Sequence, residues 1–259
     1  MFRSAVLLIV ARTTSSHSLR SSFARVPTTS TRAFSRQAAF STHPILRRHT
    51  HHHEFPEETK RHCPSCSTLL PTPLPVCPNC KHIEPLPSDM GYHEMFGFTY
   101  EPNPFDIDIS ALRPRFRKAI TVVHPDRWAG RDEGKEQLIQ SLSTTLNNAN
   151  RTLADPLQRA LYILKREGVI TDGENIVDDP ELIMDVMESR EAIENAETQE
   201  EVNQIRKENQ EKVEESVHEI SKLVAVKDWS GVLTAATKLK YLRGIDDAAR
   251  EWPRSLHDH

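Results

Sequence analysis

The stretch "ALRPRFRKAITVVHPDR", residues 111–127, combines a helical pattern with a proline-containing tripeptide. Its apolar side chains recur at the spacings i, i+4, i+7, i+8 and i+11, which places one set on a single helix face: Leu112, Phe116, Ala119, Ile120 and Val123. His124 precedes a proline, and helical backbone is disfavoured at such a position, so we expect the helix to end there. The tripeptide His124-Pro125-Asp126 is therefore expected on an exposed loop.

The remaining positions of this helix carry positive charge. Four side chains predict a basic patch on an otherwise acidic protein: Arg113, Arg115, Arg117 and Lys118. Asp106 or Asp108 can cap the first turn. Pro114 departs from a good helical sequence because it removes one backbone hydrogen bond, which predicts either a late start or a kink in the first turn.

Helical patterns flank the tripeptide on both sides. Residues 92–98, "YHEMFGF", predict a short apolar helix closed by Gly97. Asp155-Pro156 predicts the N-cap and first residue of another helix, "LQRALYIL". Between them, one apolar stripe predicts a long helix antiparallel to the first: Leu138, Leu142, Leu146, Ala149 and Leu153.

This arrangement resembles a J domain. The pattern "YHEMFGF…ALRPRFRKAITVVHPDR…NNANRTLADPLQRALYIL" is similar to the HscB or Jac-type family of mitochondrial J-domain co-chaperones of iron–sulfur cluster assembly, over about residues 91–250. The resemblance implies ATPase stimulation of a mitochondrial DnaK-type chaperone and no enzymatic activity or catalytic residue in this chain. It also implies a chaperone-docking surface formed by His124, Pro125, Asp126, Arg113, Arg117 and Lys118. The bland alternative is a loop with ordinary capping residues.

The last third of the chain predicts a three-helix bundle over residues 176–252, after a J domain at 89–168. Asp179-Pro180 opens the first helix, a Thr198–Glu201 capping box opens the second, and Asp228 caps the third. The second and third helices each have one apolar stripe: Val202, Ile205, Val213, Val217, Ile220 and Val224, then Val232, Ala236, Leu239 and Leu242. The expected fold class is therefore all-α.

The first bundle helix has more apolar surface than one stripe needs. At about 100° per residue, Leu182, Val186 and Ile193 cluster within roughly 40°, while a second set lies about 100° to 200° away. This second set is Ile183, Met184 and Met187. With the acidic neighbours Glu188 and Glu191, and with Tyr241, which lies opposite Val232 on its helix, it predicts a docking surface. By resemblance it binds an IscU-type iron–sulfur scaffold: Ile183, Met184, Met187, Glu188, Glu191 and Tyr241. The alternatives are that the J domain covers these residues, or that the client is unrelated.

All four cysteines lie in "CPSCSTLLPTPLPVCPNC", residues 63–80. Two C-x2-C pairs separated by ten residues are typical of a tetrahedral zinc site with the ligands Cys63, Cys66, Cys77 and Cys80. We expect residues 54–88 to form a module with one structural Zn²⁺ per chain, since four protein ligands leave no open position. The alternatives are two disulfides, or a zinc or thiol redox protein.

Residues 1–53 contain eight Arg but no Lys, Asp or Glu, a composition typical of a mitochondrial transit peptide. This segment predicts that the protein is located in the mitochondrial matrix. "RAFS" at Arg32–Ser35 resembles a matrix-protease cleavage site, whereas the apolar run Ala5–Ala11 could instead belong to a secretory signal. The other residues keep 25 of the 33 basic side chains against 37 acidic ones, which argues against nucleic-acid binding. No stretch approaches the length of a membrane span, and the sequence does not indicate the oligomeric state.

Overall fold

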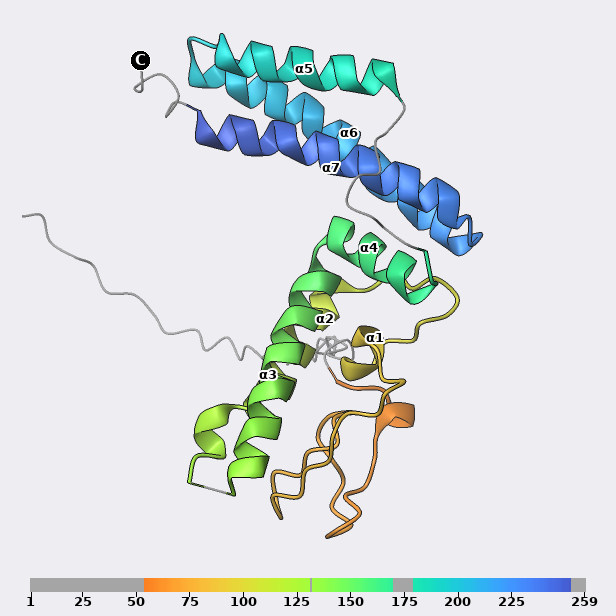
Figure 1. Ribbon diagram of the computed structural model, residues 1–259, viewed down its shortest axis with the longest axis vertical. Helices are drawn as coiled ribbons and strands as arrows, with labels where there is room; N and C mark the ends of the chain where they lie inside the picture. The colour runs from red at the N-terminus through yellow and green to blue at the C-terminus, as the bar shows by residue number, and fades with distance from the viewer. Residues whose placement is uncertain (1–53, 131, 170–178, 253–259) are drawn as a thin grey trace, which may run out of the picture. The chain divides into compact units, whose positions relative to one another are not determined.

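Helices dominate the computed structural model, which describes residues 54–130, 132–169 and 179–252 (Figure 1). The α-helices are α1 (Tyr92–Met95), α2 (Ile109–Val122), α3 (Glu133–Ala154), α4 (Pro156–Arg166), α5 (Pro180–Glu194), α6 (Gln199–Ala225) and α7 (Trp229–Glu251). Two 3₁₀ turns, η1 (Glu57–Thr59) and η2 (Pro125–Arg127), complete the described helical elements. The predicted all-α fold class is confirmed, while the predicted transit peptide and cleavage site lie outside the described residues.

Within the described ranges, no helix combines the length and the apolar character that a bilayer crossing requires.

Side chains predicted as N-caps accept hydrogen bonds from the first turns of their helices. Asp108 accepts from the amides of Ser110 and Ala111, so Asp108 rather than Asp106 caps α2. The same role is confirmed at the starts of four other helices: Asp155, Asp179, Thr198 and Asp228. α2 begins at Ile109, five residues before Pro114, so the late start that Pro114 could have imposed does not occur.

One apolar cluster holds α1, α2 and α3 together, with α2 and α3 forming the predicted hairpin. Leu112, Ala119 and Val123 of the predicted stripe are completely buried. On α3 the structure differs from the prediction in the second turn, where Ile139 is buried and Leu138 is only half-buried. From Ile139 the buried positions alternate in steps of three and four, which keeps them on one face, whereas repeated steps of four drift around a helix.

The cysteine-containing segment packs on the same cluster. Leu74 and Val76 have no exposed surface and belong to the core that includes Leu112 and Trp128, and Ile83 is packed against it. The side chains around the cysteines form a smaller cluster of their own with Leu70. The segment is therefore attached to the helical hairpin by buried apolar surface.

Helix α4 joins the hairpin to the C-terminal helices. Its buried side chains, with Phe105, share a core with residues of α6 and α7: Leu157, Ala160, Ile163, Leu164, Ile220, Val224, Val232, Ala235, Ala236 and Leu239. Arg159 of α4 donates from Nε to the Leu153 carbonyl (2.8 Å) and from Nη1 to the Phe105 carbonyl (2.6 Å). The segments expected as a J domain and a bundle thus have a buried interface.

The C-terminal helices α5, α6 and α7 lie alongside one another as a three-helix bundle (Figure 1). The predicted stripes are buried or half-buried, but the interior face of α6 also carries polar groups. Asn209 donates from Nδ2 to the Leu242 carbonyl (2.9 Å), and the Ser216 hydroxyl donates to the Ala235 carbonyl (3.3 Å). These bonds fix the axial position of α6 against α7, because an apolar stripe alone allows sliding.

Candidate functional site

The tripeptide His124-Pro125-Asp126 forms an exposed turn directly after α2. His124 has extended backbone (φ −62°, ψ 125°), so the helix ends before it, as predicted. The side chains of His124 and Asp126 are 52% and 89% exposed, and His124 Nδ1 accepts a hydrogen bond from the Asp126 amide (3.4 Å). We call His124–Arg127 the docking turn. Both side chains are accessible to a partner.

Trp128 anchors the docking turn to the core. It is 1% exposed, and its Nε1 donates to the Val122 carbonyl at the end of α2 (3.1 Å). Its amide bonds to the Pro125 carbonyl (2.8 Å), and the Arg127 amide bonds to the His124 carbonyl (3.0 Å). The sequence analysis missed this residue, although a tryptophan two positions after an exposed tripeptide is itself a signal of an anchor.

Three of the four basic side chains on α2 are exposed: Arg113, Arg117 and Lys118. Arg115 is not part of the predicted patch, because it is 8% exposed and donates from Nη1 to the carbonyls of Phe96 and Gly97 (3.1 and 3.0 Å). Its guanidinium lies 4.6 Å from the ring centroid of Phe98, and burial lowers its pKa. The basic patch therefore contains three cations, and Arg115 instead ties the end of α1 to α2.

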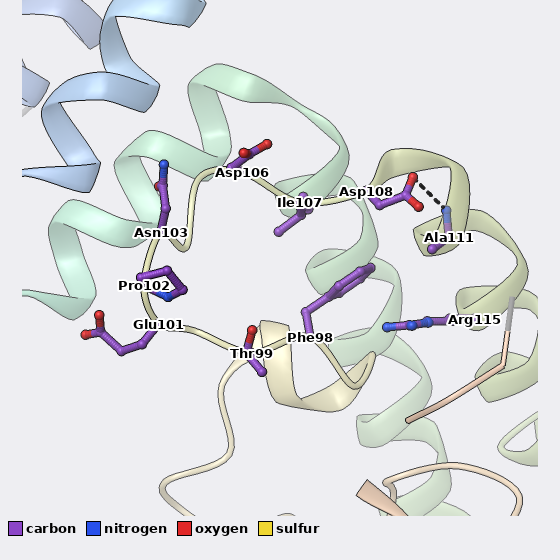
Figure 2. Close-up of a pocket in the computed structure, with 10 residues that line it drawn as sticks. All are labelled: Phe98, Thr99, Glu101, Pro102, Asn103, Asp106, Ile107, Asp108, Ala111 and Arg115. Atoms are coloured by element: carbon purple, nitrogen blue, oxygen red, sulfur yellow. Dashed lines mark hydrogen bonds between the residues drawn. The ribbon is translucent and has the colours of Figure 1, made fainter. Parts of the chain in front are cut away.

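A pocket lies between the α1–α2 connection and the start of α2 (Figure 2). The residues that line it are Phe98, Thr99, Glu101, Pro102, Asn103, Asp106, Ile107, Asp108, Ala111 and Arg115. Asn103 donates from Nδ2 to the Ser221 carbonyl of α6 (3.1 Å), and Glu101 pairs with Lys227 of the α6–α7 turn (2.9 Å), so two of its polar side chains contact the C-terminal part of the chain. The pocket contains no predicted docking or metal-binding residue. Asn103 and Glu101 serve the junction with the bundle, whereas Asp108 caps α2 and Arg115 bonds to the end of α1.

Helix α5 presents a second accessible surface. Met184 and Met187 are 61% and 65% exposed, whereas Leu182, Val186 and Ile193 are buried, as predicted for these five residues. Glu188 and Glu191 are exposed. The structure differs from the prediction at the other two residues, because Ile183 is half-buried and Tyr241 is half-buried and packs against the bundle core. We call the six predicted residues the α5 face: Ile183, Met184, Met187, Glu188, Glu191 and Tyr241. Within the described ranges the two methionines keep most of their surface accessible, so the hairpin does not bury them.

The four cysteines converge on one point. The sulfurs of Cys63 and Cys80 are 3.6 Å apart, as are those of Cys66 and Cys77, and all four lie within 4.8 Å of one another. A disulfide needs about 2.0 Å between its sulfurs, so these thiols are free. A tetrahedral ion with bonds of about 2.3 Å separates its sulfur ligands by about 3.8 Å, which the observed spacing matches. The cluster can therefore bind a metal ion.

Each C-x2-C pair is folded as a knuckle. The Ser67 amide bonds to the Cys63 carbonyl (2.8 Å), and the Lys81 amide bonds to the Cys77 carbonyl (3.1 Å). Ser67 and Lys81 both have left-handed backbone, with φ of 57° and 61°, which turns the chain back over each pair. Hydrogen bonding to Thr68 lowers the pKa of Cys66 to about 5, whereas burial raises that of Cys63 to about 11.

Comparison with known proteins finds a family model and several relatives that match this chain. The family model for the HSCB C-terminal oligomerisation domain matches residues 178–250. The co-chaperone protein HscB homologue of Burkholderia vietnamiensis is 34% identical over 157 residues, which cover 60% of this chain and 90% of that protein.

Mitochondrial and plant relatives also match. The J-type co-chaperone jac1, mitochondrial, of Schizosaccharomyces pombe is 34% identical over 157 residues, covering 60% of this chain and 65% of that protein. The iron–sulfur cluster co-chaperone protein HscB homologue of Arabidopsis thaliana is 32% identical over 139 residues, 54% of each chain. The chain thus spans less than two thirds of these two relatives.

Solved structures show the same fold. Human co-chaperone protein HscB superimposes with a TM-score of 0.61 at 23% identity, over 73% of this chain and 97% of that one. Chaperone HscB from Vibrio cholerae gives 0.58 at 25% identity, over 64% and 99%. With the exposed tripeptide after α2, the C-terminal bundle and the four-cysteine cluster, these matches show that the chain belongs to the HscB/Jac1 family of J-type co-chaperones.

Proposed function

We propose that this protein is a co-chaperone of mitochondrial iron–sulfur cluster biogenesis. It binds an IscU-type scaffold through the α5 face, presents it to a mitochondrial DnaK-type chaperone, and stimulates the ATPase of that chaperone to promote cluster transfer. The ATP is hydrolysed by the chaperone, so this chain acts as an activator and not as an enzyme. The observation that carries the proposal is the exposed docking turn at the end of a helix with three outward cations.

The chemistry of the docking turn supports a role in protein recognition. His124 and Asp126 are held by the turn itself and by Trp128, so their orientation costs little conformational entropy when a partner binds. Arg113, Arg117 and Lys118 lie on the adjoining helix, where they can steer an acidic partner surface toward the turn. Docking is therefore expected to weaken as the salt concentration rises.

The decisive experiment measures single-turnover ATP hydrolysis by a mitochondrial DnaK-type chaperone with increasing amounts of this protein. His124→Gln should abolish the stimulation and leave the melting temperature unchanged, because the side chain is exposed and makes no core contact. His218→Gln is the matched control, since His218 is an exposed histidine on α6. If His124→Gln stimulates as well as the wild type does, the assignment of the docking turn is wrong.

The α5 face fits a protein client. Exposed methionine is uncommon on a free surface, and its flexible thioether adapts to a partner. Glu188 and Glu191 add negative charge at its edge, which favours a client with basic groups around an apolar centre. A client other than an iron–sulfur scaffold would give a protein that activates the chaperone but does not bind an IscU-type scaffold.

The metal that suits four thiolates at this spacing is Zn²⁺. Cys63, Cys66, Cys77 and Cys80 would complete its tetrahedral coordination, so the ion would have a structural role. One ion per chain is the expected stoichiometry. The mitochondrial matrix is the compartment we propose, because of the composition of residues 1–53 and because the Schizosaccharomyces pombe relative is mitochondrial.

A further inference from the structure

We propose that the second knuckle, Cys77–Lys81, braces the docking turn, so that metal binding by the cysteines sets how well ordered His124–Arg127 is. The mechanical part of this inference depends only on contacts within the chain. Its consequence for chaperone docking rests on the proposed function. The chain then uses its metal module to maintain the docking turn from a segment more than forty residues away in sequence.

The direct contact is between Lys81 and Trp128. The Lys81 ammonium lies 5.5 Å from the centroid of the Trp128 ring, within the range of a cation–π interaction. Lys81 is the residue that closes the second knuckle, with its amide bonded to the Cys77 carbonyl and its backbone left-handed. The fold of the knuckle therefore sets the point from which this side chain reaches Trp128.

The base of the same knuckle is buried in the core that holds Trp128. Val76 directly precedes Cys77, is completely buried, and forms a β-bridge with Ile83, which packs on that core. The Cys77 amide also bonds to the His82 carbonyl (2.9 Å). A knuckle that opens when its ion is lost would disturb this bridge and the Lys81 contact together, because a four-thiolate module without its ion loses most of its folding free energy.

Trp128 transmits the effect to the docking turn. Two short backbone hydrogen bonds, from Arg127 to His124 and from Trp128 to Pro125, close the turn, and the indole is held by the Val122 carbonyl. Loss of contact on the other side of the indole raises the fraction of time that these bonds are open. The expected result is a less ordered His124 and Asp126, and weaker docking.

The test follows hydrogen exchange at the Arg127 and Trp128 amides by NMR in the full chain. Removing the metal with a chelator should accelerate exchange there on the order of tenfold or more, because the brace then loses its fold. With zinc bound, Lys81→Met should accelerate it by about two- to fivefold, the effect of losing one cation–π contact. The same variant should raise the amount of protein needed for half-maximal ATPase stimulation.

The matched control is Lys227→Met. Lys227 lies in a turn and, like Lys81, has left-handed backbone (φ 58°), and its ammonium pairs with Glu101, away from the docking turn. It should leave exchange at Arg127 and Trp128 unchanged. If chelation also accelerates exchange in α5–α7, its effect is not confined to the docking turn. The exchange rates of the zinc-loaded Lys81→Met protein then decide whether the brace exists. Wild-type exchange at both amides in Lys81→Met would overturn the proposal.

The mechanical inference and the proposed function can fail separately. If the wild-type protein does not stimulate the chaperone, but Lys81→Met accelerates amide exchange at Arg127 and Trp128, then the proposed function is wrong and the structural inference holds. If stimulation is normal and exchange does not change in Lys81→Met, the reverse holds.

Discussion

His93 should make the stability of this protein depend on pH near neutrality. The residue lies in α1, is completely buried, and its Nε2 is 2.7 Å from the Pro104 carbonyl. A carbonyl only accepts, so we assign the hydrogen to Nε2. A second proton would have to reside on Nδ1, which has no hydrogen-bond partner among the described residues. Burial accordingly lowers the pKa of His93 below its ordinary 6.5, and this effect outweighs the Pro104 hydrogen bond and the charge of Glu94, which raise that pKa.

The direction of the effect follows from proton linkage. As the pH falls through 6.5, the unfolded chain binds a proton at this residue while the folded protein does not, so the free energy of unfolding decreases. The loss continues down to the lowered pKa of the folded state. Between pH 7.5 and 5.5 it amounts to at most about 1.4 kcal/mol, the value of one pKa unit.

The measurement is urea unfolding of wild type and His93→Gln at pH 7.5 and 5.5, followed by far-ultraviolet circular dichroism with excess zinc. The glutamine amide can still donate to the Pro104 carbonyl but cannot bind a proton. Metal release and the other histidines are common to both proteins, so the difference between their pH slopes isolates His93. Parallel loss of stability in the two proteins would refute the reasoning.

Three further predictions concern other parts of the molecule. Arg159→Met should lower the free energy of unfolding by about 2–3 kcal/mol in urea titrations, because two buried carbonyls lose their charged donor; no loss would mean that relief of desolvation offsets it. If the cysteine cluster binds one zinc ion as proposed, Cys66→Ser should release it in metal analysis while α5–α7 keep their helical signal; zinc retained at full stoichiometry would contradict the site. Replacing Ile183, Met184 and Met187 of the α5 face with Ala should lower the free energy of unfolding by about 0.5 kcal/mol or less at each exposed site. The same triple variant should lose much of its scaffold affinity in calorimetric titration, whereas Val226→Ala, the control at an exposed apolar residue, should not. Tyr241→Ala should act in the same direction, and unchanged affinity in both variants would send the client to another surface.

Local signals in the sequence were sufficient for much of the fold. A capping residue acts on amides two or three positions away, so Asp108, Asp155 and Asp179 could be placed without knowledge of the tertiary structure. The end of α2 at the residues before Pro125 follows from the same kind of short-range steric effect. The four cysteines could be grouped because their spacing fixes which ion geometry they can satisfy.

What the sequence did not reveal depends on partners distant along the chain. Arg115 was expected outside because arginine is usually exposed, but two carbonyls at the end of α1 need a donor there. Burial of Asn209 likewise depends on the Leu242 carbonyl, 33 residues away. The contact of Lys81 with Trp128 has no sequence periodicity that could predict it. The roles of the docking turn and the α5 face stay predictions.

The buried interface of α4 with α6 and α7 connects the helical hairpin to the C-terminal bundle. Ala160 of α4 and Ala235 and Ala236 of α7 are small side chains in that core, which allows the helix backbones to approach closely. If the docking turn and the α5 face have the roles proposed here, this buried core connects the part of the chain that meets the chaperone to the part that binds the client. The orientation of the client relative to the chaperone would then depend on close packing at three alanines. Ala160→Leu would overpack this interface and change that orientation, while the residues of both binding surfaces stay the same.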